Sequence, residues 1–322
     1  LSLFMALALC LTMLPTAAFA ETSDAAAQTA GGTADTGGAY TIDKDTAAPD
    51  QEERDALSVW ALRAESSEHA HCVCGVKGCE KWLVTASGSH TNAISFSDHA
   101  ISQDAEGLKI NGTVWEKREL KTSDNTVVGY YYRLPAGDYY LTTDLDLEDA
   151  YIATATGTVN LCLNGHSIQT TAKRTICVSN ERTTATLNLC DCKGTSGTYG
   201  EITHTGGASG VGVEVRTENK FNMYGGRITG NNRSGVDTSG GYFTMYGGEI
   251  SDNTASNKGG GVYMEASVGN YQGGILNVSG AAKITDNTVK GVANNVYLPS
   301  GKTITIGEGG LSGKIGVTTE TK

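Results

Sequence analysis

Five residues near the N-terminus combine side-chain types and spacing that could bind a metal ion. They provide two imidazoles and three thiols within eleven residues: His69, His71, Cys72, Cys74 and Cys79. Thiolate and imidazole are the ligands that Zn²⁺ takes in tetrahedral structural sites. The cysteine spacing differs from the paired C-x-x-C pattern, so a local disulfide with one cysteine left over, or reduced thiols, is the alternative. A metal bound here would be structural, because the cluster itself can supply every ligand.

Tyrosine and aspartate residues in the second half of the chain form another set of candidates. Tyr224 and Tyr246 occupy the same step of two repeated segments and could stack on a sugar ring. Stacking of the two tyrosines on each other is the alternative, and it is the explanation that we favour. Asp252 and Asp286 could contact a ligand, but each precedes an asparagine at an expected corner, where aspartate commonly forms turns.

These candidates depend on a repeat that runs from Phe221 to Asn287. The copies are F-N-M-Y-G-G-R-I-T-G-N from Phe221, F-T-M-Y-G-G-E-I-S-D-N from Phe243 and L-N-V-S-G-A-A-K-I-T-D-N from Leu276. The first two begin 22 residues apart and the third follows after 33, with an insert at 266–273. Repeats of this length, built from short strands and Gly or Asn turns, are typical of solenoids.

The alternation within each copy predicts which side chains face inward. Apolar residues alternate with polar ones, as in a half-buried strand, and a second short strand carries an inward isoleucine. The expected inward residues are Phe221, Met223, Ile228, Phe243, Met245, Ile250, Leu276, Val278 and Ile284. The corner asparagines can pair amide to amide between coils: Asn231, Asn253 and Asn287. Together these features predict an all-β parallel β-helix of about seven coils over residues 129–322.

The same alignment predicts a contact between two cysteines. The segments 159–168 and 187–192 match the later repeats and place Cys162 and Cys190 at one step of neighbouring coils. Adjacent strands put Cα atoms about 4.8 Å apart, within the disulfide range of roughly 4.4–6.8 Å. We therefore expect Cys162 and Cys190 to lie side by side on neighbouring coils and to form a disulfide where the environment is oxidising. Removal of Cys10 with a signal peptide leaves seven of eight cysteines, and an odd number argues against a complete disulfide framework.

The N-terminal part of the chain predicts export. Residues 1–20 are apolar and end in Ala18-Phe19-Ala20, which is typical of a secretory signal peptide. Residues 21–50 have the composition of a disordered linker, and residues 51–128 form a Cys/His-containing module or a cap over the first coil. After signal removal we expect no membrane span and a secreted or cell-surface protein. The net charge of −11 argues against nucleic acid as a partner.

Several strings in the chain resemble a known class of repeat protein. They are L-C-L-N-G-H-S-I, L-N-L-C-D-C, F-T-M-Y-G-G-E-I-S-D-N-T, G-G-G-V-Y-M and A-N-N-V-Y-L-P-S-G-K-T-I-T-I-G. In these strings the chain resembles the right-handed parallel β-helix repeat proteins of the adhesin-like type that gut Firmicutes export. The resemblance covers 130–322 and, more weakly, 65–80. It implies a secreted or surface protein of adhesin-like character.

Two functional classes remain open at this point. One is a non-catalytic module that contacts glycan or a surface protein. For such a module we expect the charged residues at one outward position of successive coils to pair with each other: Glu201, Arg227, Glu249 and Lys283. The alternative is a carbohydrate-active enzyme, either a polysaccharide lyase or a glycosidase, acting on an acidic polysaccharide. An enzyme predicts a groove walled by the insert at 266–273 over converging Asp252 and Asp286. We favour the module and assign no catalytic residue, because no aspartate pair with neighbouring His, Arg and Lys matches pectin hydrolases or lyases.

Overall fold

The structure is a computed structural model that describes residues 71–73, 94–96 and 99–320, apart from 179–183, 194–198 and 208. All of these belong to the second of two units, 1–67 and 68–322. The described residues form strands and no helix, so none of them could cross a membrane as a helix. The predicted signal peptide, the predicted linker and His69, Cys74 and Cys79 lie outside the described residues. His71 and Cys72 belong to β1 (His71–Val73), which pairs antiparallel with β2 (Ile94–Phe96).

Three long sheets make up the fold, and their neighbouring strands run mostly parallel. Sheet 1 contains β7 (Val127–Leu134), β10 (Ala150–Thr154), β13 (Arg174–Val178), β16 (Val211–Val215), β19 (Ser234–Thr238), β23 (Val262–Met264), β28 (Val296–Leu298) and β31 (Val317–Thr319). Sheet 2 contains β8 (Gly137–Leu141), β11 (Gly157–Cys162), β14 (Ala185–Cys190), β17 (Lys220–Met223), β20 (Tyr242–Met245), β24 (Ile275–Gly280) and β29 (Ile304–Leu311). Sheet 3 contains β9 (Leu145–Asp146), β12 (Ile168–Thr170), β15 (Glu201–His204), β18 (Arg227–Ile228), β21 (Glu249–Ile250), β25 (Lys283–Ile284) and β30 (Lys314–Ile315).

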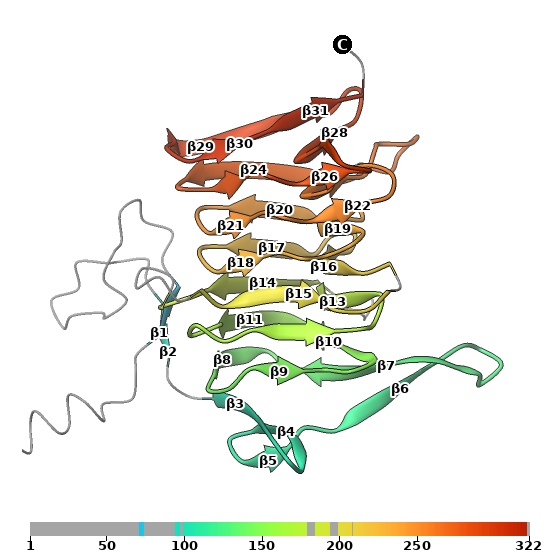
Figure 1. The fold of residues 1–322 in the computed structure, drawn as a ribbon, viewed down its shortest axis with the longest axis vertical. Helices are drawn as coiled ribbons and strands as arrows, with labels where there is room; N and C mark the ends of the chain where they lie inside the picture. The colour runs from blue at the N-terminus through green and yellow to red at the C-terminus, as the bar shows by residue number, and fades with distance from the viewer. Residues whose placement is uncertain are drawn as a thin grey trace, which may run out of the picture. The chain divides into compact units, whose positions relative to one another are not determined.

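The chain visits the three sheets in the order 1, 2, 3 and then repeats (Figure 1). The successive coils are β7–β8–β9, β10–β11–β12, β13–β14–β15, β16–β17–β18, β19–β20–β21, β23–β24–β25 and β28–β29–β30. The described residues therefore contain seven complete coils, which confirms the predicted parallel β-helix. A further small sheet, formed by β22 (Thr254–Ala255), β26 (Thr288–Val289) and β27 (Val292–Ala293), extends the corner that leads from sheet 3 to sheet 1.

Residues 99–121 extend sheets 1 and 2 beyond the first coil. β3 (His99–Asp104) pairs parallel with β8, and β4 (Gly107–Ile110) and β5 (Thr113–Val114) follow as antiparallel hairpins. β6 (Lys117–Lys121) pairs antiparallel with β7. These strands cover backbone groups that the first coil would otherwise leave unpaired at its edge, and covering such an edge is what a solenoid cap does.

The interior consists of in-register columns of apolar side chains. Phe221, Phe243 and Leu276 are partners on β17, β20 and β24, and all three are fully buried. The rings of Phe221 and Phe243 stack with centroids 4.9 Å apart and planes 9° from parallel. Met223, Met245 and Val278 form the next column and are also fully buried. The apolar residues expected to face inward therefore do so, coil upon coil.

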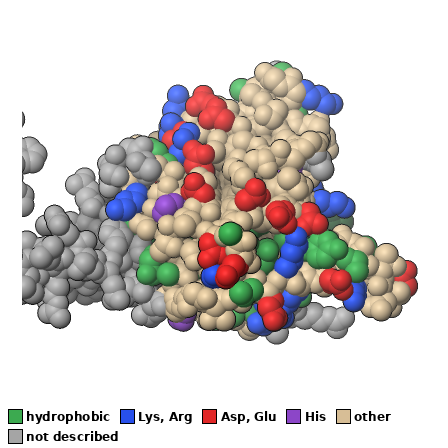
Figure 2. Space-filling model, turned by 60° about the horizontal axis from the view of Figure 1, so that its bottom comes forward, with side chains coloured by type: hydrophobic (Ala, Val, Ile, Leu, Met, Phe, Trp, Pro, Cys, Tyr) green, Lys and Arg blue, Asp and Glu red, His purple; other side chains and the backbone are tan. Residues whose placement is uncertain are grey.

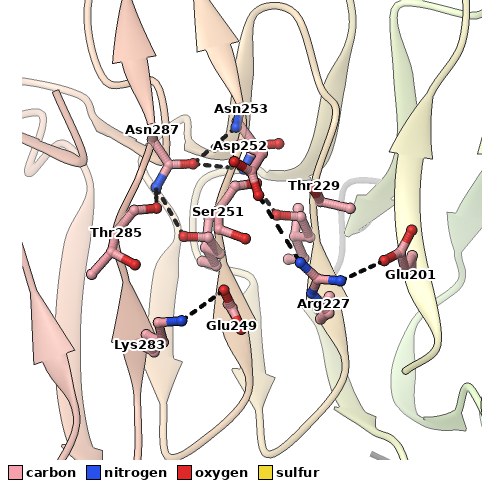
Figure 3. A network of polar contacts seen from close by, with 12 residues as sticks. Glu201, Arg227, Thr229, Glu249, Ser251, Asp252, Asn253, Lys283, Thr285 and Asn287 are labelled. Atoms are coloured by element: carbon pink, nitrogen blue, oxygen red, sulfur yellow. Dashed lines mark hydrogen bonds and ion pairs between the residues drawn. The ribbon is translucent and has the colours of Figure 1, made fainter. Parts of the chain in front are cut away.

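The corner between sheets 3 and 1 is held by a ladder of buried asparagine amides. Asn231 Nδ2 donates to Asn253 Oδ1 at 2.8 Å. Asn253 Nδ2 donates in turn to Asn287 Oδ1 at 2.8 Å (Figure 3). Asn287 Nδ2 continues the ladder to Asn295 Oδ1 at 3.0 Å. The same amides donate to main-chain carbonyls, so each one closes its own turn and joins it to the next coil.

Candidate functional site

A hollow lies on the outer face of sheet 2, across the last three coils. It is a groove of about 700 Å³. Its lining residues are Thr244, Tyr246, Asn277, Val278, Ser279, Thr305, Gly307, Glu308 and Gly309. Strand alternation explains why Thr244 and Tyr246 face the groove, because Phe243 and Met245 point inward and the residues between and after them point outward.

An aromatic column ends at this groove. Tyr224 and Tyr246 directly follow β17 and β20, and their rings stack with centroids 4.8 Å apart and planes 12° from parallel. The equivalent position of the next coil is Ser279, because the third repeat has L-N-V-S where the others have F-N-M-Y and F-T-M-Y. A serine carries no ring to continue the column. The half-buried ring of Tyr246 therefore contributes to the groove wall.

A bulge in β29 forms the opposite wall. Ile306 pairs with Val278 and Leu311 pairs with Gly280, so four residues of β29 stand opposite one residue of β24. The four residues are 307–310, and the backbone at Gly309 and Gly310 has φ of 83° and 76°, a conformation that glycine adopts readily. The bulge carries the exposed Glu308 beside the groove.

The lining residues combine an aromatic ring with several hydrogen-bonding groups. Thr244, Asn277 and Thr305 are register partners on three successive coils and supply two hydroxyls and one amide. Asn277 Nδ2 donates to Thr244 Oγ1 at 3.3 Å, which orients the amide along the column. A ring face beside amide, hydroxyl and carboxylate groups matches a saccharide, which has an apolar C–H face and a polar edge.

Asp252 and Asp286 lie elsewhere on the coil. Both occupy the corner that follows sheet 3, with φ of 58° and 61°. The turn itself uses this left-handed backbone conformation, which aspartate tolerates better than most residues. Asp252 approaches Arg227 at 4.0 Å, and neither aspartate lines the groove. The structure thus brings Tyr224 and Tyr246 together and separates them from the two aspartates.

The insert at 266–273 lies at a different corner from the two aspartates. Tyr271 donates to the carboxylate of Glu265, and Lys302 donates to the carbonyl of Gln272. These partners flank the turn that leads from sheet 1 to sheet 2, whereas Asp252 and Asp286 follow sheet 3. The insert therefore does not arch over converging aspartates, which was the arrangement expected for an enzyme.

The charged column on sheet 3 pairs with itself (Figure 3). Arg227 bonds Glu201 at 2.9 Å and Lys283 bonds Glu249 at 2.9 Å, while Arg227 and Glu249 are register partners. Partly exposed pairs of this kind stabilise a protein by up to about 1 kcal/mol each. Ion pairing between side chains on neighbouring coils therefore explains why positive and negative residues alternate along this column, and no ligand is needed.

Charges around the first coils are also mixed in sign. Figure 2 shows basic and acidic side chains interspersed on this face. Lys117, for example, bonds Glu148 at 3.2 Å and Asp149 at 2.6 Å. Such pairing neutralises positive charge locally on the face shown, and the expectation that nucleic acid is not a partner stays a prediction.

Cys162 and Cys190 are register partners on β11 and β14. The structure holds both as fully buried thiols, and burial raises the pKa of Cys190 well above its usual range. A third buried thiol, Cys192, lies 3.2 Å from Asn164 Oδ1, and its pKa is raised chiefly by the hydrogen bond to Cys162. The sequence alignment did not reveal this third member, because Cys192 lies beyond the strand. A disulfide between Cys162 and Cys190 remains a prediction.

Sheet 1 carries a pair of neighbouring carboxylates, of which Asp237 is buried and Glu214 is partly buried, that no sequence motif indicated. Glu214 and Asp237 are register partners on the outer face of β16 and β19. Glu214 bonds Arg174 at 2.7 Å and Arg216 at 3.0 Å, whereas Asp237 has one arginine contact, to Arg233 at 3.3 Å. Burial raises the pKa of Asp237 to about 6, and the neighbouring Glu214 adds to this effect.

Asp237→Asn is expected to stabilise the protein at pH 8 and to change little near pH 4. The pKa of Asp237 is raised from 3.8 to about 6, so its stabilising contribution is complete below about pH 3.8 and is lost as the pH rises through 6. A neutral amide avoids that loss, which amounts to about 2–3 kcal/mol. Thermal unfolding of both proteins at the two pH values measures the effect. An equal difference in Tm at both pH values would contradict the account.

No protein family, curated protein or solved structure matches this chain. Within the described residues, no group of three or more His, Cys, Asp or Glu side chains is arranged to hold a metal ion. The predicted zinc ligands fall mainly outside this part of the chain. The function is therefore inferred from the geometry of the groove.

Proposed function

We propose that this chain is a non-catalytic, adhesin-like β-helix module that is secreted or displayed at the cell surface and binds glycan through the groove at Tyr246. The observation that carries the proposal is the end of the tyrosine column in a groove lined with hydroxyl, amide and carboxylate groups. The predicted signal peptide at 1–20 and the resemblance to exported repeat proteins of gut Firmicutes support the location.

The β-helix provides a rigid platform for such binding. Tyr246 lies against Tyr224 on one side, and its backbone nitrogen and oxygen bond neighbouring coils at 2.8 Å and 3.1 Å. The amide of Asn277 is oriented by Thr244 before any ligand arrives. Groups that are already ordered lose little entropy on binding, so more of the interaction energy contributes to affinity.

The groove chemistry favours binding over cleavage. Glu308 is the one carboxylate among the described residues that line it. Hydrolysis of a glycosidic bond generally uses two carboxylic groups on either side of the bond. A lyase needs a basic Arg or Lys beside carboxylates that hold Ca²⁺, and the described lining contains neither Arg nor Lys. The polysaccharide lyase or glycosidase alternative therefore has less support.

Tyr246→Ala is expected to weaken glycan binding by about tenfold or more, the equivalent of about 1.4 kcal/mol. Ligands would be identified on a glycan array and their affinities measured by calorimetry. Tyr263→Ala is the matched control, because Tyr263 also stacks on a second tyrosine, Tyr297 at 6.0 Å, but lies on sheet 1.

Two results would count against this function. Equal loss of binding in both variants would show that stability, and not the groove, determines binding. Release of unsaturated product from a uronate polymer, followed by ultraviolet absorbance, would favour the lyase alternative instead.

A further inference from the structure

Among the described residues, tyrosines and carboxylates together hold lysine ammonium groups at two places. Lys258 Nζ lies 4.4 Å from the centre of the Tyr297 ring, donates to the hydroxyl of that tyrosine at 2.5 Å and bonds Glu320 at 3.0 Å. Lys117 Nζ lies 5.1 Å from the centre of the Tyr130 ring and bonds two carboxylates. The ring face attracts a cation through its quadrupole, and the carboxylate adds a charged hydrogen bond.

The groove on sheet 2 contains the same two kinds of group without a cation of its own. Tyr246 lines one wall and Glu308 lies on the bulge that forms the other. No Lys, Arg or His occurs among the described residues that line the groove. Glu308 forms no hydrogen bond or ion pair with another described residue, so its carboxylate is available to a ligand.

The charge of the groove distinguishes between classes of saccharide. A uronate would bring a carboxylate next to Glu308, and the chain already carries a net charge of −11. A neutral sugar would give Glu308 no charged partner. A sugar with a primary ammonium group can place that group beside the carboxylate while its ring lies against Tyr246.

We propose that the groove selects saccharides that carry ammonium groups, such as unacetylated glucosamine units, over N-acetylated or uronic-acid units. This proposal rests on the glycan-binding function proposed above and specifies the class of ligand. Tyr246 provides the stacking surface and Glu308 provides the charge selectivity.

Calorimetric titration of the whole chain tests the proposal with three oligosaccharides of equal length. They are a glucosamine oligomer, its N-acetylated counterpart and a galacturonate oligomer, each measured at low salt below the pKa of the sugar amine. We expect the glucosamine oligomer to bind at least about tenfold more tightly than either of the others. Glu308→Gln is expected to remove this preference, whereas the control Glu116→Gln, at an exposed residue outside the groove lining, is expected to retain it.

The outcomes separate this inference from the function on which it rests. A preference that persists in Glu308→Gln would overturn the inference. Equal affinity for glucosamine and N-acetylglucosamine oligomers, lost in Tyr246→Ala, would also overturn it but would leave glycan binding in place. Absence of binding to all three oligomers and to the glycan array would overturn both.

Discussion

Phe243→Ala is expected to lower the free energy of unfolding by about 3–5 kcal/mol, as for other fully buried phenylalanines. Phe243 has no exposed surface and lies between Phe221 and Leu276 in one column of the interior. Its removal leaves a cavity between the Phe221 and Leu276 side chains of the two neighbouring coils. The rigid spacing of the backbone, set by hydrogen bonds between coils, prevents the neighbours from closing that cavity.

The measurement is chemical unfolding followed by far-ultraviolet circular dichroism. Thr244→Ala is the control, because residue 244 lies on the same strand but faces outward. We expect the control to change the stability by less than about 1 kcal/mol. Equal unfolding midpoints for the two variants would contradict the inward position of Phe243.

Asn253→Asp is expected to destabilise the protein by at least about 3 kcal/mol at pH 7, because it puts an unpaired charge into the asparagine ladder. Asn253 is fully buried, and its Nδ2 donates to the carbonyls of Ile228 and Ser251 and to Asn287 Oδ1. A carboxylate cannot donate to these three acceptors, and its negative charge would face them directly. Acid should reduce the penalty, because a protonated carboxyl can donate one hydrogen bond.

Asp252→Asn provides the control one residue away. The Asp252 side chain is 66% exposed and its φ is 58°, which asparagine also tolerates. We expect a change within about 0.5 kcal/mol. The comparison requires thermal unfolding of both variants at pH 7 and at acid pH. A larger effect at residue 252 than at residue 253 would be incompatible with the ladder.

The repeated strings were sufficient to predict the fold because each residue's role recurs at a fixed step. The F-x-M alternation assigned the inward side chains, and the spacing of 22 residues between copies assigned their partners on the next coil. The corner asparagines followed from the same alignment. Each of these inferences depends on local sequence and on stacking in register, and both properties are visible in the chain itself.

The groove could be predicted only in part. The stacked tyrosines follow from the repeat, but the opposite wall depends on a bulge at 307–310 where the last coil departs from register. The glycine-rich string G-E-G-G permits several backbone paths, so its sequence does not specify that Glu308 lies beside Tyr246. The raised pKa of Asp237 could not be predicted from the sequence either, because it depends on the burial of the carboxyl and on which residue of the neighbouring coil lies beside it.

The most direct test of the central claim is a parallel binding titration of the wild type, Tyr246→Ala, Tyr263→Ala and Asp252→Asn with a glycan identified on the array. The account predicts that Tyr246→Ala loses about tenfold or more in affinity, while the other two variants bind like the wild type. Undiminished binding by Tyr246→Ala, or loss of binding by Asp252→Asn alone, would contradict it.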